Sequence, residues 1–267
     1  MPMTRHFISR EREEKRMTRE LIQENDVLKL LKSHKSIRKF KETIVEKDVI
    51  RTIVEAAQGA STSSFLQAYS IISIHDPEKR QLLAEWSGDQ KYVASAPEFL
   101  VFCADLHRLN LACSKHGLPY EAGYTEAFII ATVDAALAAQ NAMIAAESLG
   151  LGGVYIGGIR NNPDKISDLL KLPDEVYPVF GMCLGYPDHN PDVKERLPIS
   201  AVFHEETYKT PDEKEMDAYD ERIRAYYIER TKGKKRESWT ESVGTKIANE
   251  TRPHMKGYLE SKKLNQK

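Results

Sequence analysis

Cysteine is scarce in this sequence. The 267 residues contain three, Cys103, Cys113 and Cys183, and no two of them form a C-x-x-C pair. So few widely spaced cysteines argue against a disulfide framework, which indicates a reducing compartment. Residues 1–16 also lack the apolar run of a secretory signal, and they carry acidic residues that transit peptides avoid. These absences predict a cytoplasmic protein.

An excess of charge of one sign is also missing. Lys plus Arg total 39 and Asp plus Glu total 40, so the formal net charge is −1. Without a global basic field, general binding to nucleic acid is not expected. The long apolar stretch 127–149 is interrupted by Asp134 and Glu147, and carboxylates are costly in lipid. With an apolar share of 41%, we expect a soluble globular protein in which this stretch forms a buried helix.

Four common catalytic signatures are absent or incomplete. Residues 150–155 begin like the dinucleotide fingerprint G-x-G-x-x-G, but Tyr155 replaces the third glycine. A P-loop glycine spacing ends in Ile159-Arg160 instead of Lys and Ser or Thr. Tyr208 replaces the second histidine of H-E-x-x-H, and no G-x-S-x-G occurs. The sequence thus disfavours a Rossmann dehydrogenase, an ATPase, a zinc peptidase and a serine hydrolase, and it predicts no metal site.

Helical and strand patterns alternate along the chain. Apolar residues at helical spacing, or charged helical sequence, occur in four segments: 27–31, 49–57, 127–149 and the residues after Pro211. Short β-prone runs occur at 70–74, 99–104, 154–156 and 179–184. Capping signals mark three helix starts: Asp76-Pro77, Asn162-Pro163 and the capping box Ser238–Glu241, which should open the last helix. The alternation predicts an α+β domain.

The expected organisation is a charged tail and one domain. We predict the tail over residues 1–22 and the domain over residues 23–267. Residues from about 205 to 267 are polar and helical and should form a C-terminal arm. The aromatic pair Tyr226-Tyr227 in this arm is suited to contact a partner subunit.

Three clusters of cations could bind phosphate. His34–Lys39 connects two expected helices, Lys194 and Arg196 follow the last expected strand, and residues 230–236 carry five cations. Cations beside a hydroxyl suit phosphate because charge-assisted hydrogen bonds to its oxygens are strong. Each cluster also fits an ordinary solvated turn, and residues 230–236 also fit a nucleic-acid patch.

Glycines are concentrated between residues 150 and 158. A glycine allows a planar ligand to approach the backbone, where an N–H group can bond it. Packing at a junction between a helix and a strand would explain the same glycines. The hydroxyls of Ser61–Ser64, placed at the end of a helix, fit either a ligand contact or a C-terminal turn.

Together these segments resemble the NADPH-dependent, oxygen-insensitive nitroreductases and flavin reductases of the large bacterial type, which bind FMN. The motifs that carry the resemblance are HKSIRKF (34–40), STSSFLQ (61–67), AAESLGLGGVYIGGIRNNP (145–163), CLGYP (183–187) and KERLP (194–198). They occur in order, and the resemblance runs from about residue 26 to 258. It implies a nitroreductase-like α+β fold with a central mixed or antiparallel sheet. It also implies an intertwined homodimer with helix 127–149 at the interface.

The resemblance further implies which residues bind FMN and NADPH. The FMN phosphate and ribityl chain would be held by His34, Lys35, Ser36, Arg38, Thr62, Lys194 and Arg196. The flavin ring would be lined by Gln90, Lys91, Tyr92, Tyr155, Ile156, Gly157 and Gly158. The 2′-phosphate of NADPH would be received by Arg230, Lys235 and Arg236. Asp89 stands where relatives usually have Gly, and Lys235 where they usually have Arg.

The implied activity is an FMN-dependent oxidoreductase with ping-pong kinetics. It would move a hydride from NADPH through flavin N5 to a nitroaromatic, a quinone, an azo compound or free flavin, with no side chain acting as acid or base. One alternative is a dedicated FMN reductase that supplies reduced flavin to a partner. A second, from another class, is a non-catalytic nucleotide or nucleic-acid binding module that uses residues 230–236.

Overall fold

The computed structural model describes residues 25–267, so the tail predicted over residues 1–22 lies outside the described residues. The described chain divides into two compact units. The first contains residues 25–192 together with Met255–Lys267, and the second contains Val193–His254. Each unit is described by itself below.

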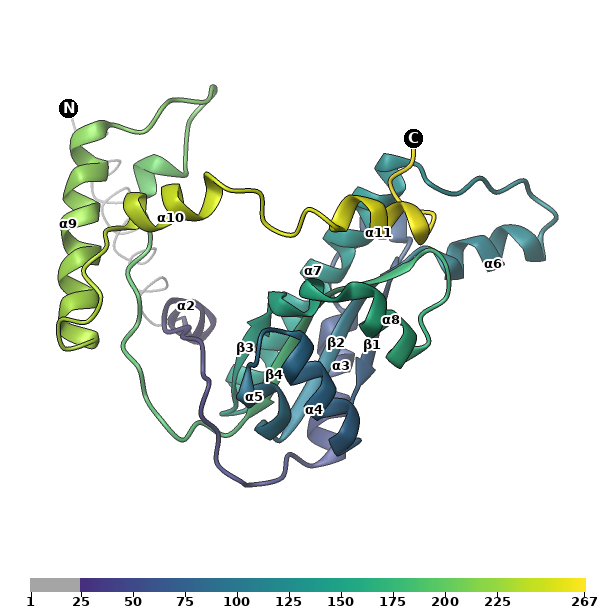
Figure 1. The fold of residues 1–267 in the computed structure, drawn as a ribbon, viewed down its shortest axis with the longest axis horizontal. Coiled ribbons are helices and arrows are strands. Elements are labelled where there is room, and N and C mark those ends of the chain that lie inside the picture. The colour runs from purple at the N-terminus through teal and green to yellow at the C-terminus, as the bar shows by residue number, and fades with distance from the viewer. Residues whose placement is uncertain (1–24) are drawn as a thin grey trace, which may run out of the picture. The chain divides into compact units, whose positions relative to one another are not determined.

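The first unit is built on a four-stranded sheet (Figure 1). Its strands lie in the order β1 (Tyr69–Ser73), β2 (Glu98–Asp105), β4 (Val176–Gly185) and β3 (Gly152–Ile156). Every neighbouring pair is antiparallel. The four predicted strands are therefore confirmed, and the predicted central sheet takes its antiparallel form.

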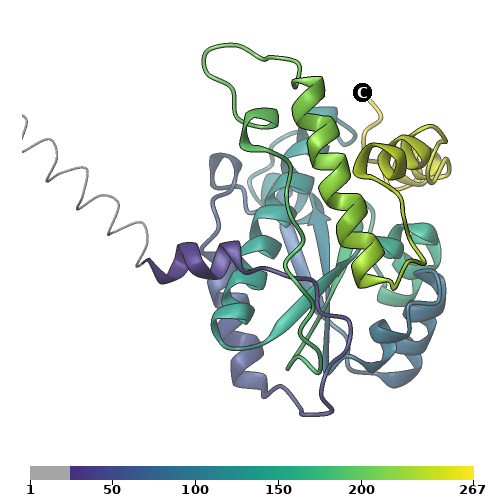
Figure 2. The same cartoon turned by 90° about the vertical axis from the view of Figure 1, so that its left-hand side faces the viewer.

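Helices cover both faces of this sheet (Figure 2). One face carries α3 (Lys47–Gln58) and α7 (Thr125–Ser148), and the other carries α4 (Pro77–Trp86), α5 (Lys91–Ser95) and α8 (Pro163–Leu170). Successive side chains of a strand point to opposite faces of the sheet, and helices cover both faces here. All of β2 is therefore buried. Phe99 and Val101 pack with α4, α5 and α8, whereas Leu100 and Phe102 pack with α3 and α7. The sheet is thus the middle layer of the core.

Helix α7 buries one face and exposes the other. Ala135, Ala138 and Ala142 are fully buried, and their small side chains let the helix lie close to the sheet. The helix ends at Ser148, and Gly150 takes a φ of +80°, which glycine adopts at low cost. Among the described helices α7 alone is long and apolar enough to cross a membrane, although many core helices share these properties. The predicted buried helix is therefore only half buried.

Local capping residues set several helix starts, and those at Asp76 and Ser238 were predicted. Asp76 accepts hydrogen bonds from the backbone N–H groups of Glu78 and Lys79 and opens α4. Helix α2 (Asp26–Lys32) starts at Asn25, whose side chain accepts from the N–H of Leu28. The capping box that joins Ser238 and Glu241 is present at the start of α10 (Trp239–Ile247).

Two expectations about helices need correction, and one helix was not expected. Helix α10 is not the last, because α11 (Met255–Ser261) follows it and packs on α8. Asn162 precedes α8 without capping it by its side chain, since its amide donates to the carbonyl of Trp86. Helix α6 (His107–Lys115) is the helix that was not expected, and none of its residues is buried.

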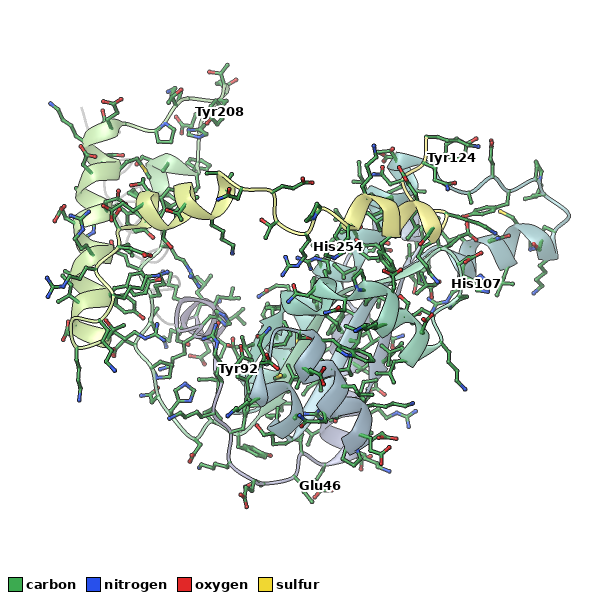
Figure 3. The ribbon with its side chains drawn as sticks, viewed as in Figure 1. Glu46, Tyr92, His107, Tyr124, Tyr208 and His254 are labelled. Atoms are coloured by element: carbon green, nitrogen blue, oxygen red, sulfur yellow. The ribbon has the colours of Figure 1, made fainter. Side chains whose placement is uncertain are left out.

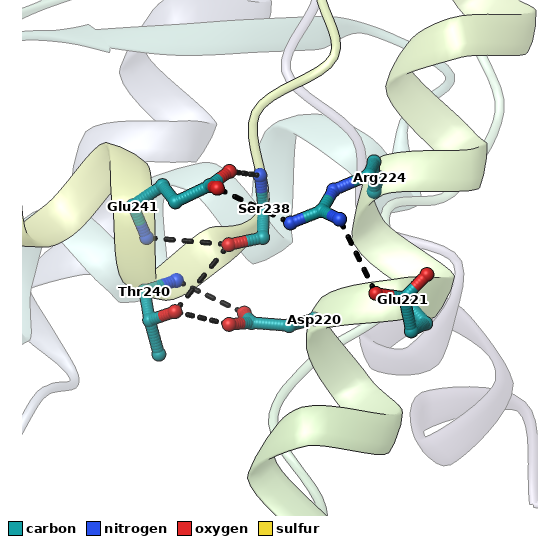
Figure 4. Close-up of polar contacts among 6 residues, drawn as sticks. All are labelled: Asp220, Glu221, Arg224, Ser238, Thr240 and Glu241. Atoms are coloured by element: carbon teal, nitrogen blue, oxygen red, sulfur yellow. Dashed lines mark hydrogen bonds and ion pairs between the residues drawn. The ribbon is translucent and has the colours of Figure 1, made fainter.

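The second unit contains the 3₁₀ helix η3 (Ile199–Ala201), α9 (Glu213–Arg230), α10 and their connecting loops. Tyr219 and Ile223 of α9 are buried, and the Tyr219 ring packs edge-on against Trp239. A polar network joins the two helices (Figure 4), in which Arg224 bridges Glu221 and Glu241. The unit therefore depends on a small apolar contact and on exposed polar contacts.

Candidate active site

Two of the predicted site segments lie side by side in the first unit. The backbone N–H of Ile37, in the middle of His34–Phe40, donates to the carbonyl of Gly153 at 2.9 Å. The Ile37 side chain is 3% exposed and covers Gly152, where any Cβ would overlap it. Close packing therefore explains Gly152, and it brings the cationic segment to the glycine run.

The cations of this segment differ in their partners. His34 Nδ1 lies at a hydrogen-bonding distance of 2.6 Å from Glu147 Oε1 of α7. Lys35 donates to the side chain of Asn190. Arg38 is exposed and pairs with no residue of the described part of the chain. Lys39 is likewise exposed, and only its backbone makes a contact within the described residues. Arg38 and Lys39 are thus the cations of this segment that are available to an anion.

Gly158 lies against the segment that contains Gln90. It belongs to the 3₁₀ turn η2 (Gly157–Asn161), and a Cβ there would overlap both the Ser87 carbonyl oxygen and Gln90 Nε2. Gln90 donates to that same carbonyl at 2.6 Å, and Tyr92, labelled in Figure 3, donates to Gln90 Oε1. Gln90, Tyr92 and Gly158, all predicted to meet the flavin ring, are therefore in one cluster.

Gly157 borders open space. A Cβ added to Gly157 would lie 3.5 Å from its nearest neighbour, an Arg160 side-chain nitrogen. A cavity of about 350 Å³ begins there and is lined by Ala136, Gln140, Tyr155, Gly157, Arg160 and Phe180. The Tyr155 ring meets Phe180 edge-on at 5.2 Å. Burial raises the pKa of Tyr155, and the Glu147 charge adds to this, so its phenol stays neutral. One glycine and two aromatic side chains therefore border this space.

Thr62 lies in a loop that a buried carboxylate holds. Asp134 of α7 is 1% exposed, and its two oxygens accept from the N–H groups of Ser63 and Ala68, both at 3.0 Å. Between these anchors Ser64, Phe65 and Gln67 have positive φ values, which L-residues rarely adopt. Helix α3 ends at Gln58, so the expectation that Ser61–Ser64 ends a helix is wrong.

Sequence reasoning missed the role of Asp134. It treated this residue as an interruption of an apolar helix. A lone carboxylate on a buried apolar face must find donors, because its burial is otherwise costly. That rule was the signal from which a loop anchor could have been inferred.

Three other predicted residues occupy separate places. Ile156 is fully buried in the core cluster with Phe99, so its side chain is not open to a ligand. Lys91 is the exposed first residue of α5. Ser36 is half-buried beside Ile37.

The described residues contain no group of three or more His, Cys, Asp or Glu that could hold a metal ion.

Cations from two predicted binding sets meet on one phenol in the second unit. Lys194 donates to the Tyr227 hydroxyl at 2.7 Å, and Lys235 lies 4.3 Å from the centre of the same ring. Arg230 donates to the hydroxyl of the neighbouring Tyr226 at 2.9 Å. Partial burial acts to raise the pKa of Tyr227, but the Lys194 hydrogen bond and the nearby cations outweigh it and lower the pKa.

The remaining predicted cations of this unit lie outside that contact. Arg236 is exposed and donates to the carbonyl of Gly233. Arg196 is exposed on the loop that follows Lys194. The predicted roles of Lys194 and Arg196 toward FMN stay predictions.

Two family profiles match the chain over most of its length. One, described as "Nitroreductase family", matches residues 31–186, and one, described as "Nitroreductase family, C-terminal domain", matches residues 194–267. The NADPH-flavin oxidoreductase of Vibrio harveyi is 44% identical over 240 residues, which are 90% of this chain and 98% of that protein. The oxygen-insensitive NADPH nitroreductase of Salmonella typhimurium is 46% identical over 232 residues, which are 87% of this chain and 95% of that protein. The solved structure of NfrA1 from B. megaterium is similar with a TM-score of 0.88 and 46% identity, covering 91% of this chain and all of that one.

Proposed function

The chain belongs to the nitroreductase family, and from this membership we propose that it is an FMN-dependent oxidoreductase. It takes a hydride from NADPH and delivers it to a nitroaromatic, a quinone, an azo compound or free flavin. The observation that carries the proposal is the contact between Ile37 and Gly153, which joins the cationic segment His34–Phe40 to the glycine run. When bound, FMN supplies the redox chemistry, and the protein supplies position and electrostatics.

The described residues of the first unit fit an FMN molecule. Arg38, free of other partners in the described chain, would pair with the phosphate, with Lys35 and Ser36 beside it. Gly157 leaves room for a ring to approach the backbone at the 350 Å³ cavity. Backbone N–H groups of Gly157-Gly158 would donate to the ring edge and stabilise negative charge there, as preorganised donors do in an oxyanion hole.

No side chain at this site is required as an acid or base. Tyr155 stays neutral because burial raises its pKa, and His34 is engaged with Glu147. We infer that these residues orient and desolvate the bound molecules. One exposed ring face would serve NADPH and the acceptor in turn, which predicts ping-pong kinetics.

A homodimer is part of the proposal. Ile129, Val133 and Leu137 of α7 are 47%, 48% and 43% exposed and follow one another at four-residue spacing. Ala136 and Gln140 follow Val133 and Leu137 by three residues each, so they lie next to this apolar stripe on α7. Both residues line the cavity beside Gly157. A second copy that covers the stripe would also close the cavity. Replacement of Val133 by Glu should convert the dimer to a monomer in analytical ultracentrifugation and weaken FMN binding.

An anaerobic titration tests the activity. NADPH should bleach the visible absorbance of the FMN-loaded protein in the absence of acceptor, and a quinone added afterwards should restore it. Bleaching without recovery by quinones or nitro compounds, but with recovery by free FMN, would identify a dedicated flavin reductase. No bleaching would refute the proposed function.

We also expect cytoplasmic location, no membrane insertion and no nucleic-acid binding.

A further inference from the structure

A second cavity of the first unit lies between α3 and the sheet. It has a volume of about 390 Å³, within the roughly 300–1,000 Å³ that small-molecule sites occupy. One face of α3 lines it, and Ser73, His75 and Glu98 line it from the sheet. It shares no lining residue with the cavity beside Gly157, so the proposed redox site does not account for it.

Glu98 brings a buried carboxyl group to this cavity. It is 2% exposed, and its Oε1 accepts hydrogen bonds from the Ser73 hydroxyl at 2.6 Å and from the N–H of Phe99 at 3.2 Å. No described residue donates a hydrogen bond to Oε2. His75 Nδ1 lies 3.8 Å from this oxygen, which is beyond the range of a hydrogen bond. Because a buried polar atom without a partner is costly, Oε2 is suited to a donor that enters the cavity.

The buried cation Arg80 does not supply that donor. Burial lowers the pKa of Arg80, and the charge of Glu98 opposes this shift, so the two side chains interact through their charges. The N–H groups of Arg80 donate instead to the carbonyls of Ile74, Val93 and Ala96. Arg80 thus provides charge compensation for Glu98 but no hydrogen bond to Oε2.

The side of the cavity that faces Glu98 from α3 is partly apolar. Val45, just before the helix, is 7% exposed, and Ile50 and Val54 are half-buried. These three side chains all line the cavity. An apolar group of a ligand would find its contacts there.

One cation of the lining has no partner. Arg51 and Glu55 form an ion pair with each other at 3.3 Å, whereas Lys47 is exposed and makes no ion pair or hydrogen bond through its ammonium with any described residue. Lys47 is also the first residue of α3, and the N-terminus of this helix has no side-chain cap. The partial positive charge of an uncapped helix N-terminus favours an anion in the same place as the ammonium of Lys47.

We propose that this cavity binds a small zwitterion with an apolar side chain, the chemical class of the apolar α-amino acids. The ammonium group of the ligand donates to Glu98 Oε2, its apolar side chain packs on Ile50 and Val54, and its carboxylate pairs with Lys47. An anion without an ammonium group leaves Oε2 without a donor, and an amine without a carboxylate leaves Lys47 unpaired. The inference does not depend on the proposed function.

Three probes separate these contacts. L-Phenylalanine carries both charged groups, phenethylamine lacks the carboxylate, and 3-phenylpropanoate lacks the ammonium. Isothermal titration calorimetry on the FMN-loaded protein at neutral pH should show saturable binding of L-phenylalanine. Phenethylamine should bind about threefold more weakly, as for the loss of an exposed ion pair, and 3-phenylpropanoate roughly tenfold more weakly, as for the loss of a hydrogen bond between charged groups.

Glu98→Gln tests the buried acceptor. Glutamine has nearly the same volume, and its oxygen can keep the hydrogen bonds from Ser73 and Phe99, but its amide group cannot accept from an ammonium. The affinity for L-phenylalanine should therefore fall roughly tenfold, whereas the affinity for 3-phenylpropanoate should not fall. Circular dichroism confirms that the variant is folded.

Lys47→Met tests the cation, and Lys41→Met is its matched control. Lys41 is an exposed lysine that precedes the same helix and does not line the cavity. Lys47→Met should weaken the binding of L-phenylalanine about threefold and leave that of phenethylamine unchanged. Lys41→Met should leave the affinity for both probes at the wild-type value.

The outcomes decide the inference separately from the proposed function. No binding of L-phenylalanine at millimolar concentration, or wild-type affinity for it in Glu98→Gln, would overturn the site. Equal affinity of the wild type for all three probes would overturn the assignment to a zwitterion. If Glu98→Gln fails to fold, the three probes on the wild type and Lys47→Met still decide. A protein that binds L-phenylalanine but is not reduced by NADPH would refute only the proposed function.

Discussion

The glycine run of the first unit and the basic loop of the second are held by different forces. Around Gly153 and Gly158, backbone hydrogen bonds and close packing determine where each atom lies. Around Tyr227, exposed or half-exposed lysines lie on a phenol through side-chain contacts. At Gly153 and Gly158 the packing leaves no room for an added Cβ, and we expect salt to have little effect on it. The arrangement around Tyr227 tolerates substitution, and its contribution should weaken as salt screens the charges.

Substitution at two adjacent glycines gives the largest expected contrast. Gly158→Ala places a Cβ on the Ser87 carbonyl, a backbone atom that cannot rotate away, and should lower the free energy of unfolding by about 1–3 kcal/mol. In Gly157→Ala the added Cβ has no neighbour closer than 3.5 Å, so the free energy of unfolding should hardly change. Urea denaturation measures both values. Equal losses in the two variants would contradict the packing account.

The buried anchor Asp134 should show the next largest effect. Asp134→Ala leaves the N–H groups of Ser63 and Ala68 without their acceptor, which should cost about 1–3 kcal/mol for each unsatisfied group. Asp134→Asn keeps one acceptor oxygen and should fall between the wild type and the alanine variant. Hydrogen exchange at these two amides should accelerate in the same order. Unchanged protection would show that the loop is held by other contacts.

Charge removal in the basic loop should have a smaller effect. Lys235→Met should raise the KM for NADPH about fivefold and leave the KM for NADH unchanged, because an exposed ion pair contributes about 1 kcal/mol. The increase should shrink at high salt. Lys232→Met, on the same loop, is the control for a general loss of positive charge. An equal increase of the KM for NADPH in both variants would show that the loop acts through its total positive charge and not through Lys235.

The smallest effect concerns the titration of a single phenol. The ammonium of Lys194 favours the phenolate of Tyr227 and so lowers its pKa. Lys194→Met should therefore raise the pKa of Tyr227, which alkaline ultraviolet difference spectra measure. In Tyr227→Phe, the spectral change at the lower pH that Tyr227 produces should be absent. An unchanged pKa of Tyr227 in Lys194→Met would refute the contact between Lys194 and Tyr227.

The elements with local signals could be predicted from the sequence. Asp76-Pro77 and the capping box at Ser238 act within one helical turn, so the residues involved are neighbours in the chain. The period-2 and period-3.6 patterns likewise report burial within each element. The family resemblance then linked distant segments that periodicity alone left separate.

The contacts that depend on distant partners could not be derived from these patterns. Asp134 anchors residues that lie 71 and 66 positions earlier in the chain. Tyr227 contacts both Lys194 and Lys235, to which the resemblance assigned different ligands. The Thr231 hydroxyl bonds the backbone of both Tyr227 and Lys235, and this places Lys235 near Tyr227. Such pairings follow from tertiary packing, and no spacing rule encodes them.

A crystal structure of the protein loaded with FMN tests the central claim most directly. The account predicts the flavin ring in van der Waals contact with Gly157-Gly158 and the phosphate within hydrogen-bonding distance of Arg38. An FMN molecule bound away from either group would contradict it.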